Sequence, residues 1–535
     1  MQHSTGSRAR WLGLVAISLA VAIIIVDSTI VNVAIPSIVD DLGIGSTQVQ
    51  WVQESYTLVF AALLLVFGAL ADRVGRRRMV LVGVLIFVAA SILAASAPTG
   101  DLLIAARVVQ GVGGAMILPT TLSLINAGFR GRDRGIAFAV WGSTIGGMAA
   151  VGPLLGGWLT TSFSWRWAFG VNVPIGALIV VGLLLFVAES RDADARGIDV
   201  VGALLAVVTT GTLVFGLIEG RSYGWWTATD AVPSWWAPSL SPVPIAFAVT
   251  LVAGGAFVWW GVRRDRLGLP AMLDVALLRI PSFRDGNVAA MIVALGEFGI
   301  ILSLPLWLQG VLGYDALQTG LVLLALAIGS FVASGFAGAM GGRLSAVAIV
   351  RAGLVAEVVG LAAVALAIGP DASWIAIVPG LFVYGFGVGL ATAQLTNVVL
   401  RDVPVALSGQ GSGTQSTSRQ IGSALGIALL GTILFTSASG ILDARLAERS
   451  VPDEARQQIV ATVVDSSGTA IPALAAQDAQ AGEDARIAFS DATRLAALTA
   501  AGFVALGLLS TLRLRSRPAD GEDSDAPAAR EAPPA

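Results

Sequence analysis

Long apolar stretches recur along the chain and are separated by short polar or charged segments. A bilayer has a hydrocarbon core about 30 Å thick, which an apolar helix of about 20 residues can cross. By this measure fourteen stretches can span a membrane, in a set of six, a pair and a second set of six. They lie at residues 12–35, 51–71, 79–97, 102–126, 136–160, 166–188, 199–219, 242–262, 286–309, 317–341, 345–368, 373–399, 406–437 and 491–513.

The composition supports a polytopic, all-α membrane protein. Hydrophobic residues make up 56% of the 535 residues and charged residues only 13%, which leaves too little polar surface for a soluble protein of this size. The first stretch is longer than the core of a signal peptide and continues into Pro36 without a small-residue cleavage site, so we interpret it as a retained span.

The arginines predict the orientation. All 32 basic residues are arginine, and with a cytosolic amino terminus their clusters fall in cytosolic segments, whereas the short outer loops carry chiefly Arg166 and Arg221. We therefore expect a multi-pass protein of the plasma (inner) membrane with both termini in the cytosol. The clusters lie at 73–78, 130–134, 263–266 and 513–517.

The spans and loops divide the chain into parts. Between the last two spans lies an outer loop, 438–490, whose charges are spaced as in amphipathic helices. The Ala, Pro and acid content of the carboxyl-terminal tail predicts disorder. The expected parts are a cytosolic amino terminus (1–11), an N-terminal six-helix bundle (12–190), two linker helices (191–265), a C-terminal six-helix bundle (266–513) and the tail (514–535).

Several kinds of chemistry are excluded. Cysteine is absent and His3 is the single histidine, so disulfides and histidine-rich metal sites are not expected. Without lysine the chain cannot form the phosphate-binding loop G-x-x-x-x-G-K-[ST]. No nucleophile motif such as G-x-S-x-G stands on a credible strand-to-helix turn. We expect no metal, no cofactor, no nucleic-acid partner and no enzymatic reaction.

A degraded repeat links the two sets of six spans. The string GALADRVG, residues 68–75, follows the second span, and GAMGGRLS, residues 338–345, follows the tenth. With the extra pair of spans placed between the two sets, these loops become equivalent, as in a duplicated transporter. Only the first copy keeps its acid, Asp72, which Gly342 replaces in the second.

Several strings carry a resemblance to a known family. GALADRVGRRRM resembles the loop signature of the major facilitator superfamily, and VDSTIVNVAIP, RVVQGVGGAMILP, VGPLLGGW and WRWAFGVNVPIG resemble motifs of its fourteen-span drug:proton antiporters, the QacA/EmrB type. The resemblance implies two six-helix bundles plus two linker helices, around a central cavity that opens alternately to either side. It also implies that the spans at 12–35, 102–126, 286–309 and 373–399 line this cavity.

Asp27 stands inside the apolar run AIIIVDSTIVNVAIP, where a charge costs at least ~2.5–3.5 kcal/mol. At 1.5 Å per residue, Asp27 and Arg107 lie within about 5 Å of the same depth, so we expect an ion pair between them. The pair is either a permanent structural contact or a proton site whose charge can be switched. The second reading is favoured because acids within membranes usually have a function.

Three other acids of the spans are considered as proton-coupling candidates. Glu297 is near the middle of a span on which the repeat and the resemblance place the cavity, and it is the second candidate for proton coupling. Glu54 is shallower and could face either the cavity or headgroup water. Glu357 is as deep as Glu297, but the resemblance puts its span at the periphery, so it receives no role.

The loop string has two interpretations. Its arginines could merely fix the topology, but the pattern of glycines around an acid favours a latch that holds neighbouring helices together at the cytosolic side. The residues of this candidate gating loop are Gly68, Asp72, Arg73, Gly75, Arg76 and Arg77.

Two further groups of residues are candidates. Small residues in the fifth span permit close helix approach and bending. They are Gly152, Pro153, Gly156 and Gly157. In the resembling family this ordered string marks exporters. Rings and amides suited to bulky amphipathic molecules are the candidates for the substrate cavity: Trp307, Gln309, Tyr384, Gln394 and Asn397. Arg419 lies in a small-residue string of the thirteenth span, with functional and structural readings evenly balanced.

The expected function is proton-driven export of hydrophobic or cationic small molecules, including antimicrobial drugs, by a monomer in the lipid bilayer. The alternatives are a proton-coupled importer, a transporter of one specific metabolite and, from another class, a membrane-embedded enzyme.

Overall fold

The computed structural model describes residues 7–514 except 192–196, 230, 234–235, 237–238 and 341–343. Gly342, residues 1–6 and most of the tail therefore lie outside the described residues. The helices are α1 (Ser7–Leu42), α2 (Ser46–Val74), α3 (Arg76–Ala95), α4 (Gly100–Gly128), α5 (Gly131–Ser162), α6 (Trp167–Gly170), α7 (Asn172–Phe186), α8 (Val200–Glu219), α9 (Pro242–Arg266), α10 (Val275–Leu278), α11 (Pro281–Gly310), α12 (Ala316–Met340), α13 (Ala346–Ala367), α14 (Trp374–Leu400), α15 (Ser408–Glu448), α16 (Asp453–Asp465), α17 (Ile471–Gln477) and α18 (Ala479–Ser510).

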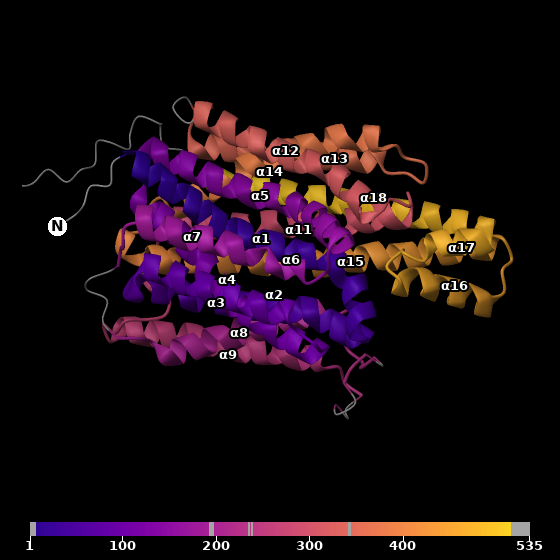
Figure 1. Cartoon of the computed structure of the whole chain (residues 1–535), viewed down its shortest axis with the longest axis horizontal. Coiled ribbons are helices and arrows are strands. Elements are labelled where there is room, and N and C mark those ends of the chain that lie inside the picture. Colours follow the sequence, from indigo (N-terminus) through magenta and orange to yellow (C-terminus); the bar gives the residue numbers. More distant parts are fainter. Residues whose placement is uncertain are drawn as a thin grey trace, which may run out of the picture.

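The described residues form an all-helical bundle with the long helices roughly parallel to one another (Figure 1). Hydrocarbon offers no hydrogen bonds to the backbone, and a helix satisfies its own N–H and C=O groups. Thirteen helices of the described chain are long and apolar enough to cross a membrane, and the bent helix α5 makes fourteen. The expected all-α polytopic fold is confirmed.

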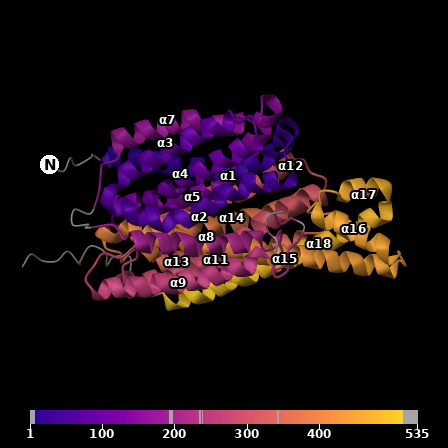
Figure 2. The ribbon, with the colours of Figure 1, turned by 90° about the horizontal axis from the view of Figure 1, so that it is seen from below.

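Two groups of helices lie side by side. Helices α1–α7 pack on one another, as do α11–α15 and α18, while the pair α8 and α9 lies against α2 and α15 (Figures 1 and 2). We call the first group the N-terminal bundle, the second the C-terminal bundle and α8–α9 the linker pair. Contacts between the bundles run chiefly through α2 with α15 and through α5 with α12 and α14.

The two ends of the molecule differ. One end carries the start of α1 and the turns α2–α3, α4–α5 and α14–α15, and we call it the terminal face. At the other end, the α16 face, α16 and α17 project beyond the bundles together with the ends of α15 and α18 (Figure 1). The projecting parts of α15 and α18 are joined by Arg445 and Arg449, which both donate to Asp484.

Some helices are longer than the apolar stretches that predict them. Helix α15 continues to Glu448 and α18 begins at Ala479, so α16 and α17 occupy a shorter connection than the expected loop 438–490. The reason is that a helix needs apolar residues only inside the hydrocarbon, whereas polar helix formers continue it beyond the membrane.

Local sequence sets several boundaries. Gly75, at φ +115°, separates α2 from α3 in a backbone conformation that other residues adopt only with strain. The Asp199 carboxylate accepts a hydrogen bond from the backbone N–H of Gly202 and so caps α8. In α5 the segments Gly131–Met148 and Val151–Ser162 meet at 41°, near Pro153, which has no N–H to donate to the helix.

Close backbone approach holds α13 against α14. A Cβ atom on Gly360 of α13 would lie 2.6 Å from the Cα atom of Tyr384 in α14. No real Cβ contact is this short, so the two helices can pack this closely only with glycine at the crossing.

We predict that Gly360→Ala destabilises the protein by about 1–3 kcal/mol, the usual cost of overpacking a tight contact. The midpoint of thermal unfolding of the purified protein in detergent should fall. Gly255→Ala in α9 is the matched control, because a Cβ there meets no atom within 4 Å. Equal midpoints for the two variants would contradict this account of the α13–α14 contact.

Candidate functional site

Asp27 lies on α1 with 0% of its surface exposed and with both carboxylate oxygens partnered. Arg107 Nη1 donates to Oδ2 at 2.5 Å, and Gln110 Nε2 and Asn172 Nδ2 donate to Oδ1 at 3.0 and 2.8 Å. The expected ion pair is therefore present. One guanidinium neutralises the charge and two amides complete its hydrogen bonding, which is what a buried carboxylate requires.

Arg107 is itself fixed by the surrounding helices. Its Nε donates to the backbone oxygen of Val52 at 3.1 Å, and its Nη1 donates to Gln110 Oε1 at 2.9 Å. The Tyr56 ring lies 4.3 Å from the guanidinium carbon, a distance suited to a cation–π contact. The pair thus connects α1, α2, α4 and α7 at one buried point.

A second acid–arginine pair lies in the C-terminal bundle. Glu297 on α11 accepts a hydrogen bond from Arg419 Nη2 of α15 at 3.2 Å. Its other oxygen accepts from Thr392 Oγ1 of α14 at 2.9 Å. Glu297 is 3% exposed, so each bundle contains a buried acid paired with a buried or half-buried arginine. The sequence had left Arg419 without a partner.

Glu54 lies where the N-terminal bundle meets the linker pair. Gln50 Nε2 donates to Glu54 Oε1 at 3.2 Å and to Glu219 Oε2 of α8 at 2.8 Å. Two carboxyl groups from different helices therefore share one amide nitrogen near the α16 face. Glu54 does not contact Asp27 through a hydrogen bond or ion pair recorded in the described chain. Glu219 was not among the residues predicted from the sequence.

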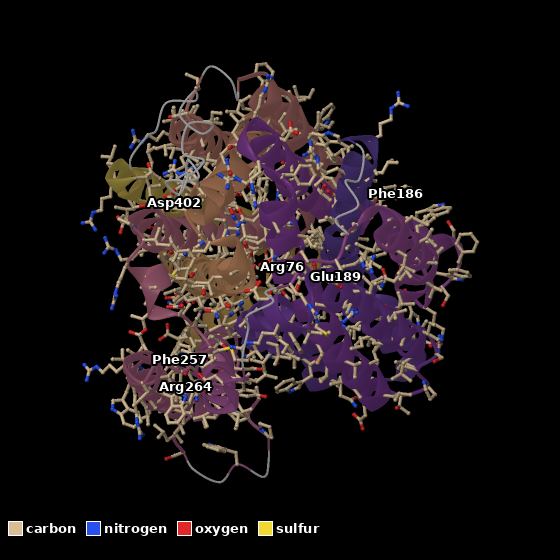
Figure 3. All side chains as sticks on the ribbon, turned by 90° about the vertical axis from the view of Figure 1, so that its left-hand side faces the viewer. Arg76, Phe186, Glu189, Phe257, Arg264 and Asp402 are labelled. Carbon is tan, nitrogen blue, oxygen red and sulfur yellow. The ribbon has the colours of Figure 1, made fainter. Side chains whose placement is uncertain are left out.

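Asp72 connects the two bundles at the terminal face. Its Oδ1 accepts from the backbone N–H of Gly409 at 2.7 Å and its Oδ2 from that of Gln410 at 3.0 Å, both in the first turn of α15. Arg76 Nη2 donates to Asp72 at 2.6 Å and to the backbone oxygen of Val405 at 2.5 Å. An acid of the N-terminal bundle therefore caps a helix of the C-terminal bundle. Figure 3 shows Arg76 near the middle of this face, where the bundles meet.

The other residues of the loop string have different surroundings. A Cβ on Gly68 would lie 2.6 Å from the Gly413 Cα, so this glycine permits α2 and α15 to touch. Arg77 stays within the N-terminal half, since its Nη1 donates to the Val187 oxygen at 3.2 Å. Gly75 packs against the Glu189 carboxylate, and Arg73 borders a cavity of about 740 Å³ at the terminal face.

Further hydrogen bonds cross between the bundles near this face. Asn126 Nδ2 donates to Ser408 Oγ at 2.9 Å. Arg134 Nε donates to Asn397 Oδ1 at 3.0 Å, and Gln394 Nε2 donates to the Gly135 oxygen at 3.2 Å. The structure thus has its terminal face closed, with Gln394 and Asn397 inside the closing contact.

The remaining cavity candidates do not gather at one place. The Trp307 ring is fully buried and its Nε1 donates to Ser490 Oγ of α18 at 3.0 Å, so it packs between α11 and α18. The Tyr384 hydroxyl donates to the backbone oxygen of Glu297 at 3.3 Å. Gln309 is half-buried near the α16 end of α11. Of this set, Tyr384 alone contacts a candidate proton-coupling acid through a hydrogen bond recorded for the described residues.

The glycines of the fifth span pack against the helix that carries Asp27. A Cβ on Gly152 would overlap the Thr29 hydroxyl, and one on Gly156 would lie 2.7 Å from Ile30 Cγ1. A Cβ on Gly157 would meet nothing within 4 Å. The string therefore brings α5 against α1 and, through Pro153, contributes to the bend of α5.

The neutral partners of the acids were missed by the sequence reading. Gln110, Asn172 and Thr392 complete the hydrogen bonding of Asp27 and Glu297, and each is a polar side chain within an apolar span. Such side chains are costly in hydrocarbon unless they are hydrogen-bonded, and this was the available signal. No group of three or more His, Cys, Asp or Glu side chains that could hold a metal ion occurs in the described part of the chain.

Comparison with known proteins identifies the family. The model of the Major Facilitator Superfamily matches residues 17–427. The chain belongs to this superfamily. It is 34% identical over 462 residues to the multidrug resistance protein Stp of Mycobacterium tuberculosis. The aligned residues make up 86% of this chain and 82% of that protein. It is 35% identical to the multidrug efflux pump LfrA of Mycolicibacterium smegmatis, over 80% of this chain and 81% of that protein.

A solved structure supports the fold. The human organic anion transporter MFSD10 (TETRAN) matches with a TM-score of 0.60 over 94% of this chain and 99% of its own, at 13% sequence identity. That likeness concerns the fold alone. Family and fold together make this chain a multi-pass membrane transport protein and not an enzyme, as the sequence predicted.

We predict that Asp72→Asn opens the terminal face. The amide keeps one acceptor, but its NH₂ group cannot accept from the N–H groups of α15, and the negative charge at the start of that helix is lost. The chain has no cysteine, so Ser408→Cys introduces a single thiol at a fully buried position of the closed contact. Maleimide labelling of that thiol should become several-fold faster when Asp72→Asn is added.

Asp265→Asn is the matched control, since Asp265 lies exposed beside the same terminal-face cavity. It should leave the labelling rate unchanged. An unaltered rate in the Asp72→Asn variant would reject the latch.

Proposed function

We propose that this transporter is a proton-driven exporter of hydrophobic or cationic small molecules, including antibiotics, that works by alternating access. The observation that carries the proposal is the pair of buried acid–arginine contacts, Asp27 with Arg107 and Glu297 with Arg419, one in each bundle. The printed functions of the relatives, multidrug resistance and multidrug efflux, support the substrate class. The energy source would be the proton gradient, without a cofactor.

The arrangement of charges supports the orientation and the division of the chain. The arginine clusters at 73–78, 130–134 and 263–266 lie at or near the terminal face, which the positive-inside rule assigns to the cytosol. The terminal face would then be the cytosolic face, and the closed contact around Asp72 would make this an outward-directed state. The helix ends also support the proposed parts of the chain, which are two bundles, a linker pair, an outer connection and a cytosolic tail. The working unit would be a monomer.

The chemistry of the two sites supports proton coupling. Arg107 can only donate, and a proton on Asp27 would remove the negative charge that holds it. Asn172 lies beside Asp27 Oδ1 and can turn its amide, so that an oxygen without a partner here accepts from a proton on Oδ1. At Glu297 the Thr392 hydroxyl can accept as readily as donate. Protonation would therefore release an arginine in each bundle without leaving the new O–H group unpaired.

The alternative transport functions predict different results in proteoliposomes. An antiporter in proteoliposomes with an acidic interior takes up the substrate as protons leave, whereas a proton-coupled importer requires the opposite gradient. Ethidium, a fluorescent lipophilic cation, is a suitable probe. Uptake of this dye together with unrelated drugs would favour a multidrug transporter, and failure with all of them would favour export of one specific metabolite.

We predict that Asp27→Asn abolishes ethidium uptake driven by an acidic interior, because the amide cannot gain and lose a charge. Uptake should fall to the level of liposomes without protein. Counterflow exchange of ethidium without a gradient should be affected less, since it requires the cavity but no net proton movement.

Asp41→Asn on the same helix is the matched control. Hydrogen bonds from Arg166 and Trp165 hold the pKa of Asp41 below its usual value, and this residue lies beyond the apolar segment Arg8–Val31. Asp41 therefore stays ionised throughout the assay and its replacement should leave coupling intact. Normal gradient-driven uptake by folded Asp27→Asn would remove Asp27 from the proton path and direct attention to Glu297 and Glu54.

A further inference from the structure

Glu357 on α13 is a buried acid that the proposed mechanism does not use. Its exposed fraction is 0%, and neither carboxylate oxygen has a hydrogen-bond partner. A buried carboxylate without a donor or cation would lose its hydration and gain nothing in return, which costs several kcal/mol. The side chain is therefore suited to the neutral, protonated form.

Close helix packing places this carboxyl in the interior. A Cβ on Gly387 of α14 would lie 2.7 Å from Glu357 Cγ and 2.5 Å from its backbone nitrogen. Any larger residue at that position would push α13 away. The glycine therefore leaves room for the acid between the helices and keeps it out of the surrounding lipid.

The charges around Glu357 are unequal in number. Glu297 on α11 and Arg419 on α15 are the charged groups that interact electrostatically with it, and the Tyr384 hydroxyl of α14 donates to the backbone oxygen of Glu297. Arg419 already neutralises Glu297. Two carboxyl groups and one guanidinium in a buried region leave one negative charge in excess unless a proton is bound.

We propose that Glu357 is a second proton-binding site of the C-terminal bundle and that it holds its proton while Glu297 is paired with Arg419. The proposal rests on the proposed function for its place in the transport cycle. During the cycle the proton leaves a Glu357 oxygen and binds a Glu297 oxygen. Arg419 then neutralises Glu357, so that the total charge of the group is unchanged.

The N-terminal bundle differs in this respect. Both oxygens of Asp27 accept hydrogen bonds, and Arg107 neutralises its charge. That pair has no excess carboxyl comparable to Glu357 among the contacts recorded for it in the described chain. The transporter would thus store a proton in its C-terminal bundle in the state in which the N-terminal acid is ionised.

Infrared difference spectroscopy of the purified transporter tests the protonation directly. At neutral pH the protein should show the C=O stretching band of a protonated carboxyl that Glu357→Gln removes and Glu357→Asp shifts. If Glu357→Gln does not fold, the shift caused by Glu357→Asp still assigns the band to this residue. Glu454→Gln, at an exposed acid of α16, should leave the band in place. Absence of any band that responds to position 357 would overturn the proposal.

The limiting ethidium gradient tests whether this proton moves. In proteoliposomes with an imposed pH difference of one unit and no membrane potential, each coupled proton contributes about a tenfold concentration ratio at steady state. Loss of one proton per cycle should lower the ratio reached by Glu357→Gln about tenfold, while Glu357→Asp and Glu454→Gln keep the ratio of the unmodified protein.

The outcomes separate the two proposals. If the unmodified protein builds no ethidium gradient from the pH difference, the proposed function fails, whatever Glu357 does. If it builds the gradient and folded Glu357→Gln reaches the same ratio, the proton on Glu357 does not take part in transport and the second site is rejected. A band that Glu357→Gln removes, together with a lowered ratio, supports it.

Discussion

The burial of negative charge within apolar helices is the constraint on which this structure depends. A carboxylate removed from water needs a cation and further donors, and each must come from another helix at the same depth. Asp27 draws Arg107 and two amides from α4 and α7, and Glu297 draws Arg419 from α15 and a hydroxyl from α14. Each acid therefore joins three helices through polar contacts that depend on its charge.

Small residues let the helices approach closely enough for these polar contacts to form. Apolar helices gain little from burial against one another in lipid, so they associate through close packing and polar contacts. Gly152 and Gly156 bring α5 onto the helix of Asp27, and Gly387 opens the space that Glu357 occupies. At the terminal face Gly68 and Gly413 allow α2 and α15 to touch, which puts Asp72 within reach of the first N–H groups of α15. The polar contacts thus form where the backbones can approach.

The sequence predicted much of the fold because hydrophobic length is a direct consequence of membrane thickness. Depth along a helix was also readable, and it paired Asp27 with Arg107 correctly. Rotation about the helix axis was not readable, because spans that are apolar on every side carry no periodic pattern to orient them. For that reason the sequence did not predict that the Trp307 indole donates to Ser490 of α18, or that Arg419 pairs with Glu297, 122 positions away. Glu219 ends an apolar stretch, where an acid is unremarkable in sequence, and its partner Gln50 belongs to a distant helix.

Helix α15 connects the acid of the C-terminal bundle with the closed terminal face. Its first turn donates two N–H groups to Asp72, and Arg419, ten residues after Gly409, holds Glu297 about 15 Å further along the same helix. A helix transmits displacement along its axis because its own hydrogen bonds resist compression. Under the proposed function, a proton on Glu297 would remove one polar contact between α15 and α11, while the close packing of Gly422 against Met291 and the cap at Asp72 would remain. Conversely, a movement of α15 that separates it from Asp72 would also move the Arg419 guanidinium relative to Glu297. Both contacts belong to one helix, so under the proposed function α15 would couple the charge of Glu297 to the closure of the terminal face without any intervening chain of side chains.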